Sequence, residues 1–422
     1  MRILFLTQVL PYPLDAGPKL RAYYVLRHLA QRHEITLVSF VRPTDTATSV
    51  AHLRSFCHAV HTIQMPRSKL LDGAHLLRSL ITGRSFIIER DWTTAMTSLL
   101  TSVVEQAGPF DAIHADQLWM APYALWLKPK LLPEAQTVLD QHNAVFMIPQ
   151  RLASGEANPL KHKLLQMEAR KLAHFEVQTC TQFDHVVWVT RDDLAVLQGQ
   201  ASQHNITLPN AGIIPICGDA EDKPMLAARQ PARRVTFLGG LHYPPNAQGI
   251  SWFAEHVFGQ VLAQAPDVCL TVIGKQPPPQ LQKLGIPHQN LDVTGFVDDP
   301  TPYLEETAVF VVPLLAGGGM RVKILDAWMW GLPVVSTRVG AEGIELGDGQ
   351  NIMLADEPQA FAQAVLHLLN HPQRAAQMGA AGRQWALAHY DWHTVYKKWD
   401  AIYAVPNPAA EDQEKIHNQI GE

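Results

Sequence analysis

Residues 316–337 read AGGGMRVKILDAWMWGLPVVST, and this stretch decides the fold. Three glycines lead into an apolar, helix-like segment, and a short β-branched run follows the turn Gly331-Leu332-Pro333. Backbone N–H groups of a glycine-rich loop at a helix N-terminus favour an anion. Arg321 and Lys323 lie in the first turn of the expected helix. The helix dipole disfavours cations there unless a bound anion lies between them and the helix N-terminus. Taken alone the loop fits a plain turn equally well, but its place after a strand favours a phosphate site.

Length and composition bound the kind of protein. With 422 residues the chain is too long for one ordinary core, which indicates two domains of about 200 residues each. Hydrophobic residues make up 47% and charged residues 17%, as in folded, core-rich proteins. The net charge of −5 argues against nucleic acid as a partner, because a duplex binder needs a dense cationic face.

Cysteine usage and the first residues bear on the compartment. The four cysteines stand far apart without a C-x-x-C pair, so neither a disulfide framework nor a zinc ribbon is expected. The opening MRILFLTQVLPYP holds an apolar run too short for a secretory signal or a membrane span. We therefore expect a soluble, cytoplasmic protein.

Short apolar runs alternate with longer amphipathic segments along both halves of the chain. Strands are expected near 3–8, 34–40, 110–116, 137–143 and 185–190, and again near 234–240, 268–274, 291–297, 308–314, 333–337 and 351–355. A long helical region is expected over 145–183, and the proline- and charge-rich residues 209–233 fit a linker best. This alternation predicts two α/β domains with doubly wound parallel sheets, whose ligands lie beyond the carboxyl ends of the strands.

Two common nucleotide motifs are absent from the expected strand ends. The dinucleotide fingerprint G-x-G-x-x-G does not follow the first strand, where Gly17 is the single glycine of VLPYPLDAGPKLR. The second domain offers FLGGLHYPPNAQG, which does not fit either, and no P-loop is present. Nicotinamide-dependent and NTPase functions therefore lack specific support.

Several segments resemble family 4 retaining glycosyltransferases. In the second half they are VTFLGGLHYPPNAQGISWF (235–253), VTGFVDDPTPYLEETAVFVVPLLAGGGMRVKILDAWMWGLPVVST (293–337) and GAEGIE (340–345). In the first half they are PYPLDAGPKLRAYYVLRHLAQRHEITLVSF (11–40), VLDQHN (138–143) and IIPICGD (213–219). The resemblance covers nearly the whole chain and is strongest to bacterial polysaccharide and exopolysaccharide sugar transferases.

This resemblance implies a GT-B fold, in which two Rossmann-like domains face each other across a cleft. We expect an N-terminal acceptor domain over 1–212, a donor domain over 213–385, a helix returning to the first domain over 386–405 and a disordered tail over 406–422. The implied reaction moves a sugar from a nucleoside diphosphate sugar to a sugar, lipid-linked or other hydroxyl acceptor, with retention and without a cofactor or metal. The leaving diphosphate would then be neutralised by side-chain cations and backbone N–H groups.

The resemblance also implies roles for individual residues. His142, Arg321 and Lys323 are the expected catalytic residues, with His142 near the donor sugar. Donor-binding residues are expected at Gly17, Gly240, Gly317, Gly318, Gly319, Met320 and Asp326. A plain turn glycine is an equally good reading of Gly17.

Two departures from the family pattern concern the same site. Where many members have Glu-x(7)-Glu, this chain has Gly318 and Asp326, and Asp326 keeps a carboxylate for the ribose hydroxyls. Where the family often has Arg and Lys after the first strand of the second domain, this chain has Gly240 and Asn246. We hypothesise that Arg321 and Lys323 supply those cations from the opposite side of the pocket.

Further candidates have weaker patterns. His114, Asp116 and Arg21 follow expected strand ends and are candidates for an acceptor or donor edge, although Arg21 could equally face solvent. Residues 67–84, RSKLLDGAHLLRSLITGR, fit a helix on the inner face of a membrane as well as an ordinary packed helix. Two other functions stay open, a nucleotide-sugar epimerase with hydrolytic chemistry and a non-catalytic sugar-nucleotide binding protein.

Overall fold

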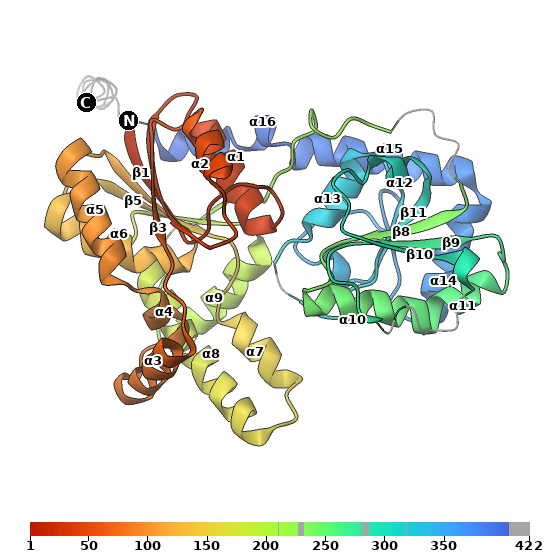
Figure 1. Cartoon of the computed structure of the whole chain (residues 1–422), viewed down its shortest axis with the longest axis horizontal. Coiled ribbons are helices and arrows are strands. Elements are labelled where there is room, and N and C mark those ends of the chain that lie inside the picture. Colours follow the sequence, from red (N-terminus) through yellow and green to blue (C-terminus); the bar gives the residue numbers. More distant parts are fainter. Residues whose placement is uncertain (210, 227–231, 280, 282–286, 318, 405–422) are drawn as a thin grey trace, which may run out of the picture.

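The computed structural model describes residues 1–209, 211–226, 232–279, 281, 287–317 and 319–404. The described chain forms two α/β domains that lie beside each other (Figure 1). The predicted tail over 406–422 and the prediction on Gly318 lie outside the described residues.

The first domain is built on a seven-stranded sheet whose strands all pair in parallel, in the order β3-β2-β1-β4-β5-β6-β7. Its strands are β1 (Arg2–Thr7), β2 (Glu34–Val41), β3 (Ala59–Gln64), β4 (Ala112–Asp116), β5 (Gln136–Gln141), β6 (His185–Trp188) and β7 (Ala211–Ile213). The central strands are buried almost throughout, because helices cover both faces of a parallel sheet. This is why their sequences read as continuous apolar runs.

Helices connect these strands. They are α1 (Gly17–Leu29), α2 (Ala47–Arg54), α3 (Lys69–Thr82), α4 (Phe86–Asp91), α5 (Thr94–Ala107), α6 (Ala121–Leu131), α7 (Met147–Ser154), α8 (Pro159–Cys180) and α9 (Arg191–Gln203). The helical region expected over 145–183 is thus two helices. Asn158 begins the second, because its side chain accepts hydrogen bonds from the N–H groups of Leu160 and Lys161. Within the expected linker, residues 211–213 form β7, which is too short to show a strand period.

The second domain has a six-stranded parallel sheet in the order β10-β9-β8-β11-β12-β13. The strands are β8 (Arg234–Leu238), β9 (Cys269–Ile273), β10 (Leu291–Gly295), β11 (Thr307–Val312), β12 (Val334–Ser336) and β13 (Met353–Leu354). The helices are α10 (Pro244–Trp252), α11 (Phe258–Leu262), α12 (Thr301–Glu305), α13 (Val322–Met329), α14 (Pro358–Asn370) and α15 (Pro372–His389). Both sheets confirm the predicted fold class of two Rossmann-like domains.

The last described helices leave the second domain and pack on the first. They are α16 (Trp392–Val395) and α17 (Lys398–Ile402), and Figure 1 shows α16 beside α1. The Trp392 ring stacks on Tyr24 of α1 with centroids 5.5 Å apart, and Asp400 lies 2.8 Å from His28. These contacts join the two ends of the chain. None of the described helices is long and apolar enough to cross a membrane.

Candidate functional site

The carboxyl ends of the two sheets face each other. A methyl group on Gly17, at the start of α1, would lie 3.7 Å from Cγ2 of Val322, at the start of α13. Farther along the same boundary, a methyl group on Gly343 would lie 2.9 Å from Thr190, which follows β6. Cavities of about 260 and 170 Å³ open here and are lined by both domains. The strand ends at which the sequence predicts a site therefore border an interdomain cleft.

The glycine loop lies between β11 and α13, where the sequence predicts it. Gly317 has φ of 133° and Gly319 has φ of 72°, values that L side chains rarely adopt. A methyl group on Gly317 would also lie 2.8 Å from the guanidinium of Arg321, so the loop is closely wrapped around this side chain. Met320 is buried at the end of the loop. Gly317 and Gly319 thus allow the backbone of the loop to lie close to the guanidinium of Arg321.

Arg321 caps the start of α13 and is only 7% exposed. Its Nη1 donates to the carbonyl oxygen of Gly319 at 3.1 Å, and its Nη2 lies 3.9 Å from Oε2 of Glu342. Burial lowers the pKa of Arg321, and the charge of Glu342 partly opposes that shift. A guanidinium resists deprotonation strongly, so Arg321 remains a cation at the floor of the loop.

Lys323 reaches from α13 to the loop that follows β8. Its Nζ donates to Oδ1 of Asn246 at 2.8 Å and lies 4.4 Å from the centre of the Phe237 ring. A methyl group on Gly239 would lie 2.7 Å from the same Nζ, so Lys323 occupies the space above this glycine. Burial, with help from the charge of Arg321, lowers the pKa of Lys323 to about 7. This geometry supports the hypothesis that Lys323 brings a cation to the β8 loop from the opposite side.

Asp326 and Gly240 border the same region. Asp326 forms an ion pair with Lys223, whose Nζ lies 3.2 Å from Oδ1. A ribose hydroxyl would therefore share Asp326 with a lysine from the interdomain segment. The carbonyl oxygen of Gly240 accepts a hydrogen bond from Nδ2 of Asn246 at 2.9 Å, and this bond orients Asn246 toward Lys323.

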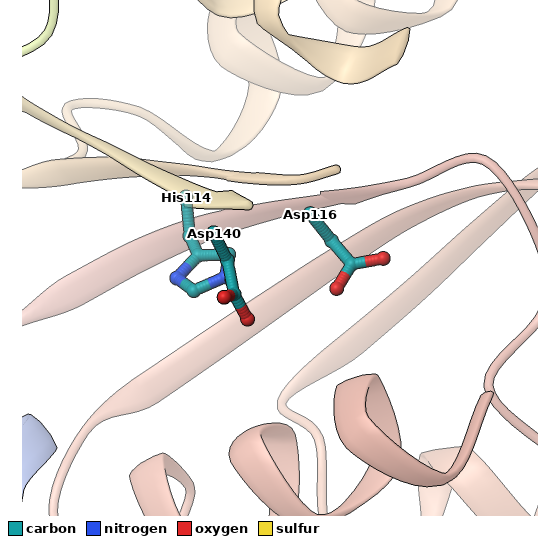
Figure 2. Close-up of side chains that lie close together, drawn as sticks. All are labelled: His114, Asp116 and Asp140. Carbon is teal, nitrogen blue, oxygen red and sulfur yellow. The ribbon is translucent and has the colours of Figure 1, made fainter. Parts of the chain in front are cut away.

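Three polar side chains of the first domain leave neighbouring strands on one face of the sheet, as Figure 2 shows. His114 and Asp116 lie two residues apart on β4, and Asp116 is paired in register with Asp140 of β5. All three are fully buried. Their charges must therefore be balanced within the protein.

The guanidinium of Arg21 balances the negative charge of the buried Asp140 carboxylate. Its Nε donates to both carboxylate oxygens of Asp140 at 2.9 and 2.8 Å, and Nη2 donates to Oδ1 at 2.6 Å. Nη1 donates to the carbonyl oxygens of Ile214 and Pro215. Burial alone would raise the pKa of Asp140, but the charge of Arg21 holds it well below its usual range. Arg21 is fully buried, so it lies inside the domain and does not form the predicted ligand edge.

His142 follows β5 and lies beside both carboxylates. Its Nε2 is 2.9 Å from Oδ1 of Asp116 and 3.7 Å from Oδ2 of Asp140. Burial lowers the pKa of His142, but the charge and hydrogen bond of Asp116 raise it more, to about 9. His142 is therefore an imidazolium at neutral pH. Its Nδ1 is buried and has no hydrogen-bond partner among the described residues.

His114 differs from His142 in its hydrogen-bond partner and in the direction of its pKa shift. Its Nδ1 lies 2.6 Å from the hydroxyl of Tyr403, and its ring stacks on Phe5 with centroids 4.0 Å apart. Burial lowers its pKa to about 4, so the ring is neutral. The structure places His114 under the sheet edge against the C-terminal segment, away from the predicted ligand edge. Asp116 faces His142 instead of a ligand.

The ligand atoms of His114, Asp116 and Asp140 lie within 4.8 Å of one another, a spacing that a metal ion could bridge. However, Asp140 already accepts three hydrogen bonds from Arg21, and Asp116 accepts one from His142. A divalent ion would add its charge beside these two cations. The donor set therefore fits two protein ion pairs better than a metal.

Two residues that the sequence did not single out support the site. Glu176 of α8 is fully buried and accepts hydrogen bonds from the N–H groups of Val145 and Phe146, which fixes the loop after His142. Arg151 of α7 donates to the carbonyl oxygen of Gly317 from across the cleft and lies 3.5 Å from Glu342. Neither belongs to a recognisable motif, since each acts through a contact far away in sequence.

Comparisons with known proteins agree with this geometry. Residues 232–371 match the family model described as Glycosyl transferases group 1. Over 389 residues the chain is 23% identical to an uncharacterized 44.6 kDa protein in the cps region of Klebsiella pneumoniae, a match that covers 89% of this chain and 92% of that protein. Over 145 residues it is 32% identical to the GDP-mannose-dependent alpha-(1-6)-phosphatidylinositol monomannoside mannosyltransferase of Mycolicibacterium smegmatis, covering 31% of this chain and 38% of that enzyme.

A solved structure extends the comparison to both domains. Anabaena HepE in complex with UDP superposes with a TM-score of 0.66 at 14% identity, over 96% of this chain and 100% of HepE. At this identity the similarity shows the fold. The matched segment 232–371 is the domain that carries Arg321 and Lys323, so this domain is similar to the glycosyl transferases of group 1, and the two domains together have the GT-B fold.

Proposed function

We propose that this chain transfers a sugar from a nucleoside diphosphate sugar to a hydroxyl acceptor, with retention at the anomeric carbon and without a divalent metal. The observation that carries the proposal is the placement of Arg321 and Lys323 around a glycine loop at the cleft. Lys323 pairs with no carboxylate among the described residues and contacts the neutral Asn246. Cations held in this way favour a diphosphate ligand over solvent.

The proposed reaction needs little more than these charges and His142. The acceptor hydroxyl attacks the anomeric carbon from the face of the leaving group, while the bond between that carbon and the β-phosphate oxygen breaks. The hydroxyl proton passes to a leaving phosphate oxygen, and a nucleoside diphosphate departs. Arg321 and Lys323 stabilise the charge that develops on it, and the His142 imidazolium donates a hydrogen bond to the donor sugar.

Two named relatives define the donors to test. The mycobacterial relative uses GDP-mannose, and the HepE structure holds UDP, so guanosine and uridine donors are both candidates for this chain. Asp326 would accept a hydrogen bond from the ribose while it keeps its ion pair with Lys223. For this chain we propose an acceptor used in glycan assembly, in line with its similarity to a protein from the cps region.

Ligand-induced stabilisation tests the binding half of the proposal. Thermal unfolding of the whole chain with UDP or GDP should show a raised midpoint for the base that the site accepts, because a ligand of the native state stabilises it. Incubation of the matching nucleotide sugar with a glycan acceptor should then release the nucleoside diphosphate in the presence of a chelator. Release of epimerised free sugar without acceptor would identify hydrolytic epimerase chemistry instead, and binding with no turnover would identify a non-catalytic protein.

A further inference from the structure

Helix α3 turns its most apolar side away from the protein. Within α3, which the structure describes in full, Ser79 is the only buried residue. Leu70, Leu77 and Ile81 are 89%, 60% and 77% exposed. With Ala74 they recur at helical spacing and so form one stripe, and Ser79 lies about 180° around the helix from Leu70. The stripe therefore faces outward.

Ser79 anchors the opposite side of the helix. Its hydroxyl donates to the carbonyl oxygen of Arg84 at 2.6 Å, and Lys171 of α8 donates to its carbonyl oxygen at 2.8 Å. These bonds hold α3 in one rotation on the domain. Inward rotation of the leucines would break them, so the outward stripe is set by polar contacts on the inner side.

Positive charge surrounds the stripe. Residues 67–84 contain Arg67, Lys69, Arg78 and Arg84 against a single carboxylate, Asp72, whereas the whole chain has a net charge of −5. Arg67 pairs with Asp91 at 2.7 Å, and Arg78 and Arg84 share Glu89, at 3.1 and 3.2 Å, so these three cations have two carboxylate partners. The surface of α3 is thus cationic on an acidic protein.

A cavity of about 560 Å³ opens beside the C-terminal end of α3. Three cations, Arg78, Arg84 and Lys171, line it against one carboxylate, Glu89, together with Ile88, Trp92 and Phe175. Cationic and apolar side chains in one cavity suit a molecule that has both an anionic and an apolar part. Arg78, next to Leu77 of the stripe in sequence, lines this cavity, so the cavity lies close to the C-terminal end of the stripe.

We propose that the outward stripe of α3 and this cavity dock on a lipid bilayer that contains anionic lipids. An apolar stripe flanked by Lys and Arg is the pattern that inserts at the boundary between head groups and acyl chains. A second copy of the chain is a poorer occupant, because pairing two α3 stripes would bring their cations together. This docking surface is independent of the transfer reaction proposed above.

Flotation of the full chain with vesicles tests the proposal. Vesicles of equal parts phosphatidylcholine and phosphatidylglycerol should bind the protein at least about tenfold more strongly than vesicles of phosphatidylcholine alone, and salt should weaken the binding. Leu77→Glu should reduce binding about tenfold or more, because it places a carboxylate in the apolar stripe. Leu387→Glu, a matched change at an exposed leucine of the second domain, should leave binding unchanged.

Other outcomes would overturn the proposal. Equal binding of the two vesicle types, or wild-type binding by Leu77→Glu, would show that α3 does not dock on anionic lipid. A lipid-free dimer that Leu77→Glu converts to monomer would show that a second copy covers the stripe. Thermal stabilisation by UDP or GDP, measured in parallel, should be the same for wild type and Leu77→Glu, which separates loss of docking from loss of the fold or of the nucleotide site.

Discussion

His142 in the first domain and Lys323 in the second are two enclosed cations at the same cleft, and their pKa values move in opposite directions. Two carboxylates, Asp116 and Asp140, surround His142, so its pKa rises to about 9 despite burial. Burial, together with the charge of Arg321, lowers the pKa of Lys323 to about 7, and its hydrogen-bond partner is the neutral amide of Asn246. The first domain thus balances its cation internally, whereas the second keeps a site whose charge an anionic ligand would balance.

The comparison predicts that Lys323 matters for function far more than for stability. Lys323→Met should lower kcat/KM for sugar transfer about 100-fold or more, because it removes a cation from the developing diphosphate charge. The free energy of unfolding should not decrease, because the substitution removes a charge that burial disfavours. Steady-state kinetics and thermal unfolding of the same preparations measure both effects.

Lys130→Met is the matched control, since Lys130 is exposed on α6 of the first domain. It should leave transfer and stability unchanged. Wild-type kinetics in Lys323→Met would contradict the phosphate site, and a large loss of stability would show that Lys323 is a structural residue.

Unlike Lys323→Met, His142→Asn should lower both the rate of transfer and the free energy of unfolding. We expect kcat to fall about 10- to 100-fold, the value of one hydrogen bond from a charged donor. Stability should fall as well, because Asp116 and Asp140 lose a cation that lies 2.9 and 3.7 Å from them. Nucleotide binding, measured by thermal shift, should remain, since the nucleotide contacts proposed above lie in the second domain.

The stability loss in His142→Asn has a definite pH dependence. The pKa of His142 is about 9 in the folded chain against an ordinary value of 6.5, so the folded state binds the proton more tightly. The stabilisation is fully present below pH 6.5 and is lost as pH rises through 9. Denaturant unfolding of both proteins should therefore show their largest difference near pH 6 and a smaller one near pH 9.5; a constant difference would contradict this linkage.

The sequence predicts the parts of the site that follow from local pattern. Buried parallel strands read as apolar runs, and residues that follow such runs reach the sheet edge, which is why the positions of the glycine loop and His142 at that edge were predictable. Arg321 and Lys323 were predictable because cations are unusual in the first turn of a helix. The contacts that Arg321 and Lys323 make with residues far away in sequence could not be predicted from local pattern. Only Asn246 was singled out, by its position in the family pattern.

The wrong expectation for Arg21 has a physical reason. Its position one turn into α1 is compatible with a ligand edge, but the sheet side of that helix also needs a cation for the buried Asp140. Asp140 stands 119 residues away, so no spacing connects the pair. Arg151 was missed for the same reason, because its contacts to Gly317 and Glu342 form only when the domains meet.

Arg151→Gln should weaken the donor site from the first domain. Arg151 is 42% exposed, and solvent-exposed ion pairs are worth about 1 kcal/mol or less, so the KM for the donor should rise no more than about fivefold. The value of kcat should change less, since Arg151 contacts the loop and not the diphosphate cations. Arg151→Lys should recover part of the loss by restoring the charge.

Arg170→Gln on the exposed surface of α8 provides the matched control and should leave the KM unchanged. A fall in kcat equal to the rise in KM would instead place Arg151 at the reacting atoms. Such a result would weaken the contrast drawn above, because both domains would then supply charge to the diphosphate.

The smallest predicted effect is the uptake of a fraction of one proton when a nucleoside diphosphate binds. This uptake distinguishes Lys323 from His142 most sharply. Lys323, with a pKa of about 7, is mostly neutral at pH 8, and a bound diphosphate should raise that pKa and draw in a proton. Calorimetry of UDP or GDP binding in buffers with different ionisation enthalpies should show net proton uptake at pH 8 and much less at pH 6. His142, with a pKa of about 9, is already protonated at both values and contributes little. Uptake that persists in Lys323→Met would assign the proton to another group, whereas its disappearance would tie the lowered pKa directly to the ligand.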